Sequence, residues 1–594
     1  MSKASTFRSG GIATPSRFLS TGWVWLCRRL RVSEAAFILV AVAIGAAAGL
    51  GSVLIGSIAR TLQHLLFALP PTLRLSSLPS LGWPTLAVLP VGGGVLALFS
   101  LATRARQRQL VDAVEANALH GGRMSMVDSL VIAGQTMLSN GFGASVGLEA
   151  AYAQIGGAVA SLLGRALSLR RGDLRTLVGA GAGAAIAAAF GAPLTGTFYA
   201  FEIVIGAYTP AAIAPVTAAA LTATFVSSLF GAQPYIVSET AGRAIETHHY
   251  LIYAGLAAIC ALIGIVLMRS VALVEMVTRR LKLPGWSRPA IGGALLIPLA
   301  ALSPQALSAG HGALHMDLMA GVSLGLIATI ILTKSAAAIV SLGFGFRGGL
   351  FFASLFLGTL VGHLFAGGVA LAIGHPVVDA TNAAMVGMAA LAVAVIGGPF
   401  TMAMLVLEAT HDFALTGAVL AAALVASTIV RELFGYSFST WRLHLRGETI
   451  KSARDIGWTR GLTAGRMMRR ETHATHTDMT VAEFRRRVPL GATSRVVLVD
   501  RDDRYAGIVQ TASAYAEGID ADACVATLAG DRDAALAPDQ DIVAVMQRFD
   551  ASGADELAVL DPQRHVLGLL SETHVRRRYA EELEKAQREL FGER

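Results

Sequence analysis

The sequence predicts an all-α polytopic membrane protein that ends in a small α/β tail. Hydrophobic residues make up 54% of the 594 residues and charged residues only 15%, whereas soluble domains carry roughly 25% charged residues. Apolar runs of about 20 residues, the length that spans a bilayer, recur from Phe37 to Phe434. After Arg446 the sequence becomes polar. The two parts should therefore fold in different surroundings.

The apolar runs differ in length, and the short ones are informative. Runs that could span a bilayer are Ala35–Ile58, Leu86–Leu101, Ala211–Leu229, Leu251–Val274, Leu318–Val340 and Leu415–Ile429. Short or glycine-interrupted runs are Leu177–Phe190, Leu350–Phe365 and Val386–Ile396. Short segments inside a membrane indicate broken helices, which are tolerated where they line a cavity.

Basic residues at both ends of the apolar region predict its orientation. Five arginines lie between Arg8 and Arg31, and six basic residues lie between Lys451 and Arg470. Because Lys and Arg favour the cytoplasmic side, both termini are predicted to be cytoplasmic. This topology accounts for the net charge of +8, and we expect no nucleic-acid partner. The three cysteines are widely spaced, so neither a disulfide framework, a metal site nor a cofactor is predicted.

Two pairs of segments indicate an internal duplication. GLEAAYAQIG at Gly147–Gly156 matches GLFFASLFLG at Gly349–Gly358, and both begin with Gly-Leu and end on Gly. FGAPLTGTFYAFE at Phe190–Glu202 matches IGGPFTMAMLVLE at Ile396–Glu408. The order and the spacing agree in both halves of the chain. Such repeats are typical of transporters with inverted repeats, whose ion site lies where the two repeats meet.

The tail contains a second, smaller duplication. Arg495–Asp500 and Tyr505–Val509 read as two strands joined by a charged turn, and the pattern returns at Glu556–Asp561 and Val566–Ser571. A short helical segment precedes each pair of strands. This tandem α/β unit resembles a pair of CBS modules, which makes an adenine nucleotide a candidate ligand of the tail.

Glu149 is the strongest candidate functional residue of the apolar region. It follows Gly141, Gly143 and Gly147 and begins a run of small residues that should form a helix. A buried carboxylate is costly unless its charge is compensated. Helix N-termini and exposed backbone N–H groups attract anions. The pattern therefore predicts an anion site in a membrane, for which the Glu149 carboxylate competes.

Four motifs of the apolar region carry a family resemblance. They are Gly147–Ala151 with Gln154–Gly156, Gly191–Gly196 continuing to Glu202, Gly348–Ala353, and Pro399–Thr401 with Val406–Glu408. They resemble the motifs Gly-Arg-Glu-Gly-Pro with Gln-Ile-Gly, Asn-Ala-Pro-Leu-x-Gly, Gly-Gly-Ile-Phe-x-Pro, and Pro-Leu-Thr with Val-Leu-Glu of the CLC family of chloride channels and chloride/proton antiporters. The run at Thr440–Glu448 is similar to the bacterial ClcB-like branch of that family.

The resemblance implies a function and a set of site residues. Glu149 would be the gating glutamate of a chloride path, in a homodimer with one pore per subunit in the plasma (inner) membrane of a bacterium. It implies no enzymatic activity. The implied anion-binding residues are Gly147, Leu148, Ala150, Gly349, Leu350, Phe351, Ser439 and Arg108. Among these, the backbone N–H groups of Leu350 and Phe351 are the donors expected from the second repeat.

Three positions depart from the family pattern. The loop Gln107–Val111 lacks the serine and glycines of the family's Gly-Ser-Gly-Ile-Pro loop and places Arg108 near the serine position. Ser439 stands where the family has a tyrosine. Ile203 stands where antiporters carry a second glutamate that accepts a proton. Because isoleucine carries no proton, the sequence favours a chloride channel, with voltage- or pH-dependent gating, over an antiporter with a non-standard proton path.

Other residues have competing interpretations. Gly143–Gly147 fits the Gly-x-Ser-x-Gly pattern, so a membrane serine hydrolase using Ser145 is a remote alternative. Lys334 and Arg347 lie in or beside apolar segments, where they could extend to the membrane interface or face an anion vestibule. Glu202 and Glu408 are more often structural, and we expect them to accept hydrogen bonds at helix ends.

The sequence predicts five segments in all. These are a cytoplasmic N-terminal segment 1–32, a CLC-type transmembrane domain 33–447 with repeats at about 33–231 and 248–435, a linker 448–463, a CBS-like pair 464–580, and a charged C-terminal helix 581–594.

Overall fold

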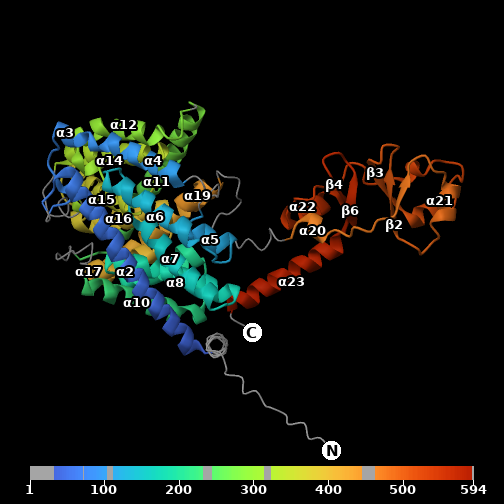
Figure 1. Cartoon of the computed structure of the whole chain (residues 1–594), viewed down its shortest axis with the longest axis horizontal. Helices are drawn as coiled ribbons and strands as arrows, with labels where there is room; N and C mark the ends of the chain where they lie inside the picture. Colours follow the sequence, from blue (N-terminus) through green and yellow to red (C-terminus); the bar gives the residue numbers. More distant parts are fainter. Residues whose placement is uncertain are drawn as a thin grey trace, which may run out of the picture. The chain divides into compact units, whose positions relative to one another are not determined.

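The computed structural model describes residues 33–70, 73–103, 111–231, 244–281, 283–313, 323–444 and 462–591. The chain divides into a unit that ends at Asp455, here called the membrane unit, and a unit that begins at Ile456, here called the tail. Figure 1 shows the first as a packed group of helices and the second as a mixture of strands and helices.

The described part of the membrane unit is helical. Its elements are α2 (Glu34–Phe67), η1 (Leu75–Ser77), α3 (Trp83–Leu86), α4 (Val88–Thr103), α5 (Ala113–Leu119), α6 (Met126–Gly141), α7 (Glu149–Ala166), α8 (Arg171–Phe190), α9 (Pro193–Tyr199), η2 (Ala200–Ile205), α10 (Pro210–Leu229), α11 (His249–Arg280), α12 (Arg288–Leu302), η3 (Pro304–Ala306), α14 (Leu324–Gly343), α15 (Phe351–Ile373), α16 (Ala380–Ile396), α17 (Pro399–Thr410), α18 (Phe413–Leu433) and α19 (Phe438–His444). Within the described residues, eight helices are long and apolar enough to cross a membrane. Of the three apolar runs expected to be short, only Val386–Ile396 lies in a short helix, α16, whereas Leu177–Phe190 and Leu350–Phe365 correspond to α8 and α15, which are long enough to span. The helices α9 and α17 are also too short to span.

Local sequence signals set several helix ends. The side chains of Ser125, Asp379 and Asp412 accept hydrogen bonds from the first backbone N–H groups of α6, α16 and α18. Helix α8 ends at Gly191, which adopts a left-handed conformation, and Pro193 opens α9 two residues later. These signals allow the chain to turn sharply between α8 and α9.

Close glycine contacts pack the matching helices of the two repeats. A Cβ atom on Gly156 of α7 would overlap the carbonyl oxygen of Gly181 on α8, and the reverse also holds. Gly358 of α15 and Gly387 of α16 are related in the same way. Gly156 and Gly358 are the last residues of the two matching segments of the sequence. The duplicated glycine therefore makes the same helix-packing contact in both repeats.

A reciprocal pair of carboxylates joins α9 to α17. Glu408 accepts hydrogen bonds from the N–H of Leu194 (2.7 Å), the N–H of Thr195 (2.9 Å) and the Thr195 hydroxyl (2.7 Å). Glu202 in turn accepts from the N–H of Phe400 (3.2 Å), and from the N–H and hydroxyl of Thr401 (2.8 and 2.7 Å).

Each glutamate therefore caps the start of the other repeat's short helix. The expectation that Glu202 and Glu408 accept hydrogen bonds at helix ends is confirmed.

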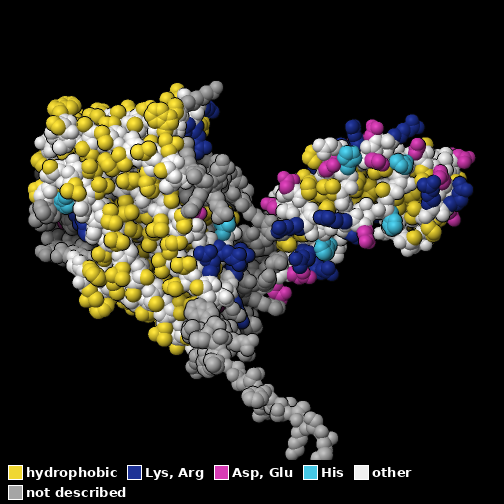
Figure 2. Space-filling view, viewed as in Figure 1, with side chains coloured by type: hydrophobic (Ala, Val, Ile, Leu, Met, Phe, Trp, Pro, Cys, Tyr) yellow, Lys and Arg dark blue, Asp and Glu magenta, His cyan; other side chains and the backbone are white. Residues whose placement is uncertain are grey.

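The surfaces of the two units differ in the way that a membrane domain and a polar tail predict. In the view of Figure 2, hydrophobic side chains cover most of the visible face of the membrane unit, whereas acidic and basic side chains are spread over the tail. Many large apolar residues of the membrane unit are exposed, among them Leu39 (68%) and Leu251 (81%). Exposed apolar helices of this length suit a lipid environment.

The tail contains two three-stranded sheets of the same design. Its elements are α20 (Ala464–Met467), β1 (Ala474–His476), α21 (Val481–Arg487), β2 (Arg495–Val499), β3 (Tyr505–Gln510), η5 (Thr511–Tyr515), η6 (Val525–Leu528), β4 (Ala535–Leu536), α22 (Ile542–Ser552), β5 (Glu556–Leu560), β6 (Val566–Ser571) and α23 (Glu572–Phe591). In the first sheet β1 is parallel and β3 antiparallel to β2; in the second, β4 and β6 flank β5 in the same way.

The two sheets also share a register. Gly507 pairs with Leu498, and Gly568 pairs with Val559, at equivalent places in the two hairpins. The all-α membrane fold with a small sheet-containing tail is thus as the sequence predicts.

Candidate functional site

Glu149 is the first residue of α7 and lies where the two repeats meet. Just before it, Gly147 and Gly349 form an antiparallel bridge: the N–H of Gly147 donates to the carbonyl of Gly349 (3.0 Å), and the N–H of Gly349 donates to the carbonyl of Gly147 (3.4 Å). A Cβ atom on Gly147 would lie against the Glu149 carboxylate. The bridge therefore sets α7 beside the start of α15, and Gly147 leaves the space that the carboxylate fills.

The Glu149 carboxylate is buried but not fully satisfied. The residue is only 4% exposed, and its carboxylate interacts with the backbone N–H groups of Phe352 and of Glu149 itself. Within the described residues, Oε2 is buried and has no hydrogen-bond partner. The N–H group from the second repeat that interacts with the carboxylate is thus that of Phe352. Phe352 is the second residue of α15 and lies one residue beyond the expected Leu350 and Phe351.

A cavity of about 140 Å³, here called the Glu149 cavity, opens beside this carboxylate. It brings together six residues that the sequence singles out, namely Glu149, Ala150, Gly349, Leu350, Phe351 and Ser439, and it also reaches Ile203. Sequence reasoning missed Tyr199, Asp112 and Arg442 in its lining. Tyr199 lies in the Pro-Leu-x-Gly helix three residues before Glu202. This position in a recognised motif was the one feature of the sequence that could have identified Tyr199 as a site residue.

The other predicted residues have different places. Gly147 serves the bridge through its backbone. Leu148 lines a second cavity of about 470 Å³, here called the Arg60 cavity, which also contains Arg74 and His311. Arg108 lies outside the described residues.

Lys334 is fully buried in α14, with 0% exposure. Its Nζ donates to the carbonyl oxygens of Ser308 (2.6 Å) and Ala306 (3.3 Å). The interpretation that Lys334 extends to the membrane interface is therefore wrong. Lys334 also acts electrostatically on Glu149.

A buried polar network connects Lys334 to the loop before α7. The N–H of Ser308 donates to the carbonyl of Gly143 (3.0 Å). Asn140 Nδ2 donates to the Ser308 hydroxyl (3.2 Å) and to the carbonyl of Val146 (2.7 Å). Gln63 Nε2 completes the network with bonds to Asn140 Oδ1 and Ser308 Oγ, both at 3.0 Å. These bonds fix the loop that delivers Glu149 to the cavity.

A third cavity of about 470 Å³, here called the Glu202 cavity, is lined by Glu202, Arg431 and Tyr436. It shares Ile203 and Ser439 with the Glu149 cavity. It also shares Val114 and Ile396 with that cavity, so none of these four shared residues carries an ionisable side chain. Arg347, by contrast, lines the Glu149 cavity itself, in keeping with its assignment to an anion vestibule.

Nucleophile and metal chemistry gain no support from the described residues. Ser145 is fully buried, and its hydroxyl has no hydrogen-bond partner there that could act as a base. No group of three or more His, Cys, Asp or Glu side chains in the described ranges could hold a metal ion.

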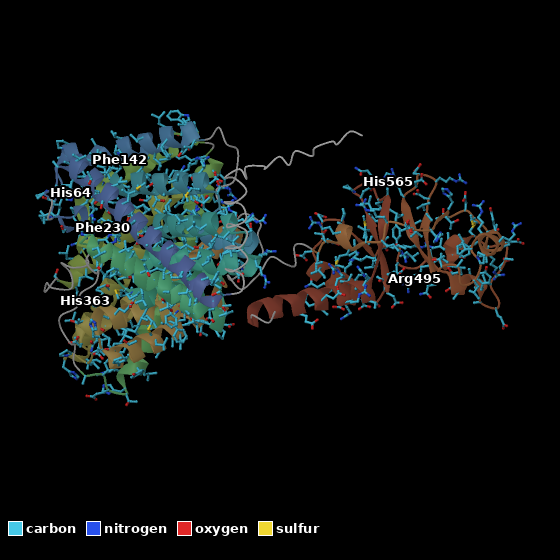
Figure 3. All side chains as sticks on the ribbon, turned by 60° about the horizontal axis from the view of Figure 1, so that its bottom comes forward. His64, Phe142, Phe230, His363, Arg495 and His565 are labelled. Carbon is cyan, nitrogen blue, oxygen red and sulfur yellow. The ribbon has the colours of Figure 1, made fainter. Side chains whose placement is uncertain are left out.

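The tail has a cleft of about 640 Å³ between equivalent ends of its two hairpins, here called the Arg495 cleft. Arg495 forms an ion pair with Asp555 across the two halves (2.5 Å), and Glu556 and Thr511 also line the cleft. Figure 3 labels Arg495 together with His565, which lies on the same unit. The one arginine of the lining is therefore already paired with a carboxylate.

Comparison with known proteins agrees with this architecture. The sequence profile of the family described as "Voltage gated chloride channel" matches residues 88–431, more than half of the chain. A putative chloride channel protein, ClcB-like, from Ralstonia nicotianae is 27% identical over 377 residues, covering 62% of this chain and 88% of the relative.

Two solved structures share the fold. A slow cyanobacterial Cl⁻/H⁺ antiporter matches with a TM-score of 0.60 at 22% identity, over 69% of this chain and 97% of that one. A eukaryotic CLC transporter matches with a TM-score of 0.58 at 16% identity, over 92% of this chain and 98% of that one. Together with the matching profile, these findings show that the chain is a multi-pass membrane protein of the voltage-gated chloride channel (CLC) family, in its ClcB-like branch.

Proposed function

We propose that this protein conducts chloride through the Glu149 cavity and that Glu149 is its gate. One observation carries the proposal: the buried Glu149 carboxylate, with one oxygen lacking a partner among the described residues, lies at the start of a helix where the two repeats meet. Backbone donors that hold a carboxylate there can hold a chloride ion instead. When Glu149 is ionised it occupies the donors, and when it is protonated or displaced it leaves them to chloride.

The backbone N–H donors of the Glu149 cavity suit the passage of chloride rather than its permanent binding. The N–H of Phe352 carries only a partial charge, and ions pass quickly only through sites that also release them. Lys334 lies outside the lining of the cavity, and its Nζ is occupied by carbonyl oxygens. It therefore lowers the cost of an anion in the cavity without binding that anion directly.

A channel fits the cavity residues better than a coupled antiporter does. Ile203, which follows Glu202, lines both the Glu149 cavity and the Glu202 cavity, and the Glu202 carboxylate already accepts three hydrogen bonds. Neither residue offers a ready proton acceptor. The alternative is chloride/proton exchange along a non-standard path, which the structural likeness to a Cl⁻/H⁺ antiporter favours.

Chloride efflux from liposomes tests the gate. Glu149→Gln should raise efflux at neutral pH and flatten its pH dependence, because the amide cannot carry the charge that competes with chloride. Glu432→Gln, at an exposed glutamate of α18, is the matched control and should leave efflux unchanged. Unaltered efflux and pH dependence in Glu149→Gln would refute the assignment of the gate.

A proton measurement separates the two transport modes. With an outward chloride gradient, a channel moves chloride without protons, whereas an exchanger drives protons uphill. Uphill proton movement by the wild type would replace the channel assignment with the exchanger. Ser145→Ala should leave chloride flux intact, and a hydrolase activity lost in that variant would support the remote alternative instead.

The wider assembly is part of the same proposal. We infer a homodimer with one pore per subunit in the inner membrane of a bacterium, both termini being cytoplasmic. The transmembrane domain would extend over 33–447 and the CBS-like pair over 464–580. An adenine nucleotide remains the candidate ligand of the tail, and equilibrium dialysis of the full chain against labelled ATP would test it.

A further inference from the structure

The Glu149 cavity has few hydroxyl groups that an anion could use. Three of its described lining residues carry one: Thr136, Tyr199 and Ser439. The Thr136 hydroxyl already donates to the carbonyl of Ile132 within its own helix (2.9 Å). Tyr199 and Ser439 make no side-chain hydrogen bond to any residue in the described ranges. Only these two hydroxyls are therefore available to a ligand.

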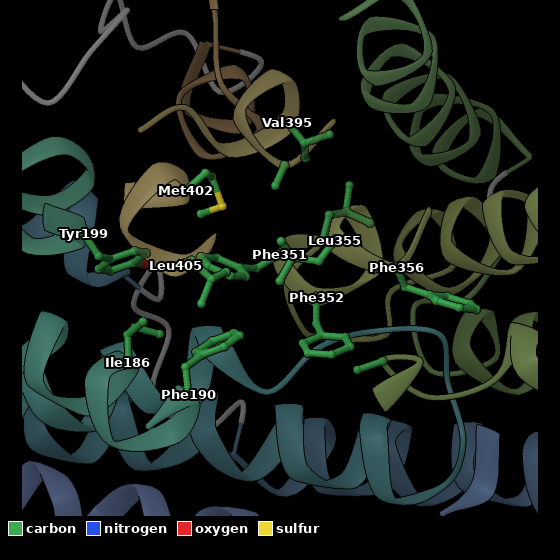
Figure 4. Close-up of a cluster of buried hydrophobic side chains, with 14 of the residues drawn as sticks. Ile186, Phe190, Tyr199, Phe351, Phe352, Leu355, Phe356, Val395, Met402 and Leu405 are labelled. Carbon is green, nitrogen blue, oxygen red and sulfur yellow. The ribbon is translucent and has the colours of Figure 1, made fainter. Parts of the chain in front are cut away.

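Tyr199 is held rigidly at the end of α9. The residue is 8% exposed, and its ring packs against that of Phe351, with 6.2 Å between the centroids. Figure 4 shows Tyr199 and Phe351 within one cluster of buried side chains that also includes Phe190 and Leu405. The start of α9 is fixed by the Glu408 carboxylate. A phenol fixed by packing along its ring loses little conformational freedom when its hydroxyl binds a ligand.

The hydroxyl also lies in the electrostatic range of the gate. Both Glu149 and Asp112 act on Tyr199, and both line the same cavity. The Tyr199 hydroxyl faces this cavity without a hydrogen-bond partner in the described ranges, and water or an anion there would supply one. Since a phenol is neutral and donates a single hydrogen bond, it can bind chloride and release it again.

We propose that the Tyr199 hydroxyl donates a hydrogen bond to chloride in the Glu149 cavity. It would add a neutral hydroxyl donor to the cavity, where Ser439 carries a much shorter hydroxyl side chain than a tyrosine. The assignment rests on the proposed chloride function and adds to it a residue from the first repeat's short helix.

Tyr199→Phe tests this assignment with little disturbance, because the substitution removes only an oxygen that has no described protein partner. Chloride binding to the purified full chain, measured by isothermal titration calorimetry, should weaken about 10- to 100-fold, the value of one hydrogen bond to an ion. Tyr253→Phe is the matched control, since Tyr253 is a buried phenol (1% exposed) of α11 outside the cavity lining. It should bind chloride as the wild type does.

The outcomes separate the two proposals. Chloride binding by Tyr199→Phe within twofold of the wild type would overturn the role of Tyr199 while leaving the gate intact. If the wild type itself bound no chloride, the proposed function would fail first. Ser439→Ala should weaken binding less than Tyr199→Phe, and the reverse order would make Ser439 the main donor and refute the assignment.

Discussion

Replacing Glu408 by alanine should destabilise the membrane unit by about 2–4 kcal/mol. The residue accepts three hydrogen bonds from the start of α9, all between 2.7 and 2.9 Å. Bonds to a charged acceptor contribute roughly 1.5–3 kcal/mol each. The sum is reduced here because Leu194 is 39% exposed, so water can reach part of the freed donors. Glu408→Gln keeps one carbonyl oxygen as an acceptor and should cost about half as much.

The mirror residue provides an internal check. Glu202 accepts the same three kinds of bond from Phe400 and Thr401, and Phe400 is 38% exposed. Glu202→Ala should therefore match Glu408→Ala within about 1 kcal/mol. The double variant should cost less than the sum of the two, because both carboxylates join the same pair of helices.

Tryptophan fluorescence during denaturant titration of the full chain in detergent is a suitable assay. All six tryptophans precede residue 459, so the signal does not come from the strands of the tail. Glu432→Ala, at an exposed site on α18, is the control and should change the free energy of unfolding by less than about 0.5 kcal/mol. A cost below about 1 kcal/mol for Glu408→Ala would refute the capping argument.

Three further predictions concern the gate, the buried lysine and the tail. Gly147→Ala places a Cβ against the Glu149 carboxylate, so chloride efflux from liposomes at neutral pH should rise and lose part of its pH dependence. Lys334→Met leaves the carbonyl oxygens of Ser308 and Ala306 without their donor and should cost about 2–4 kcal/mol in the same fluorescence titration, part of which Lys334→Arg should restore. In the tail, the backbone N–H of Arg504 holds the pKa of Asp500 below its usual 3.8. Because the folded pKa is lowered, this stabilisation is present at neutral pH and is lost as the pH falls through and below 3.8. The hydrogen-exchange protection factors of β2 and β3, corrected for the intrinsic exchange rate at each pH, should therefore fall in acid in the wild type and depend less on pH in Asp500→Asn.

Each of these predictions has a result that would contradict it. Wild-type efflux in Gly147→Ala would mean that the carboxylate has room to move without leaving its donors. Equal stability of Lys334→Met and the wild type would mean that the buried ammonium is energetically neutral. An acid limb of hydrogen exchange that is identical in Asp500→Asn would assign the pH dependence to another group.

Features that depend on short stretches of sequence could be predicted well. The four predicted strands of the tail begin and end within one residue of their predicted limits, since Arg495–Asp500 is observed as Arg495–Val499 and Val566–Ser571 as predicted. The short strands β1 and β4, which complete the two sheets, were not predicted. Alternating apolar residues and a charged turn determine such a hairpin locally. The matched glycines of the duplication were equally visible, because a helix-packing contact requires a small residue at a fixed position.

Features that depend on distant segments could not be predicted. Whether Lys334 points to lipid or inward is decided by the carbonyls of Ala306 and Ser308, which a separate segment supplies. The N–H that reaches Glu149 belongs to Phe352 rather than to Leu350 or Phe351, and a shift of one residue at a helix start rotates the donor by about 100°. Tyr199 lines the cavity beside Phe351, a residue of the second repeat whose ring it contacts.

The bridge between Gly147 and Gly349 has a consequence for how the protein is made. Its two partners are separated by 202 residues of chain, which a ribosome adds in about 10–40 s at 5–20 residues per second. During that interval Glu149 is already in the membrane, but the Phe352 N–H that interacts with it has not yet been synthesised. A nascent chain halted after the first repeat should thus hold an exposed acid at its helix start, and the carboxylate gains its second-repeat donor only when α15 emerges.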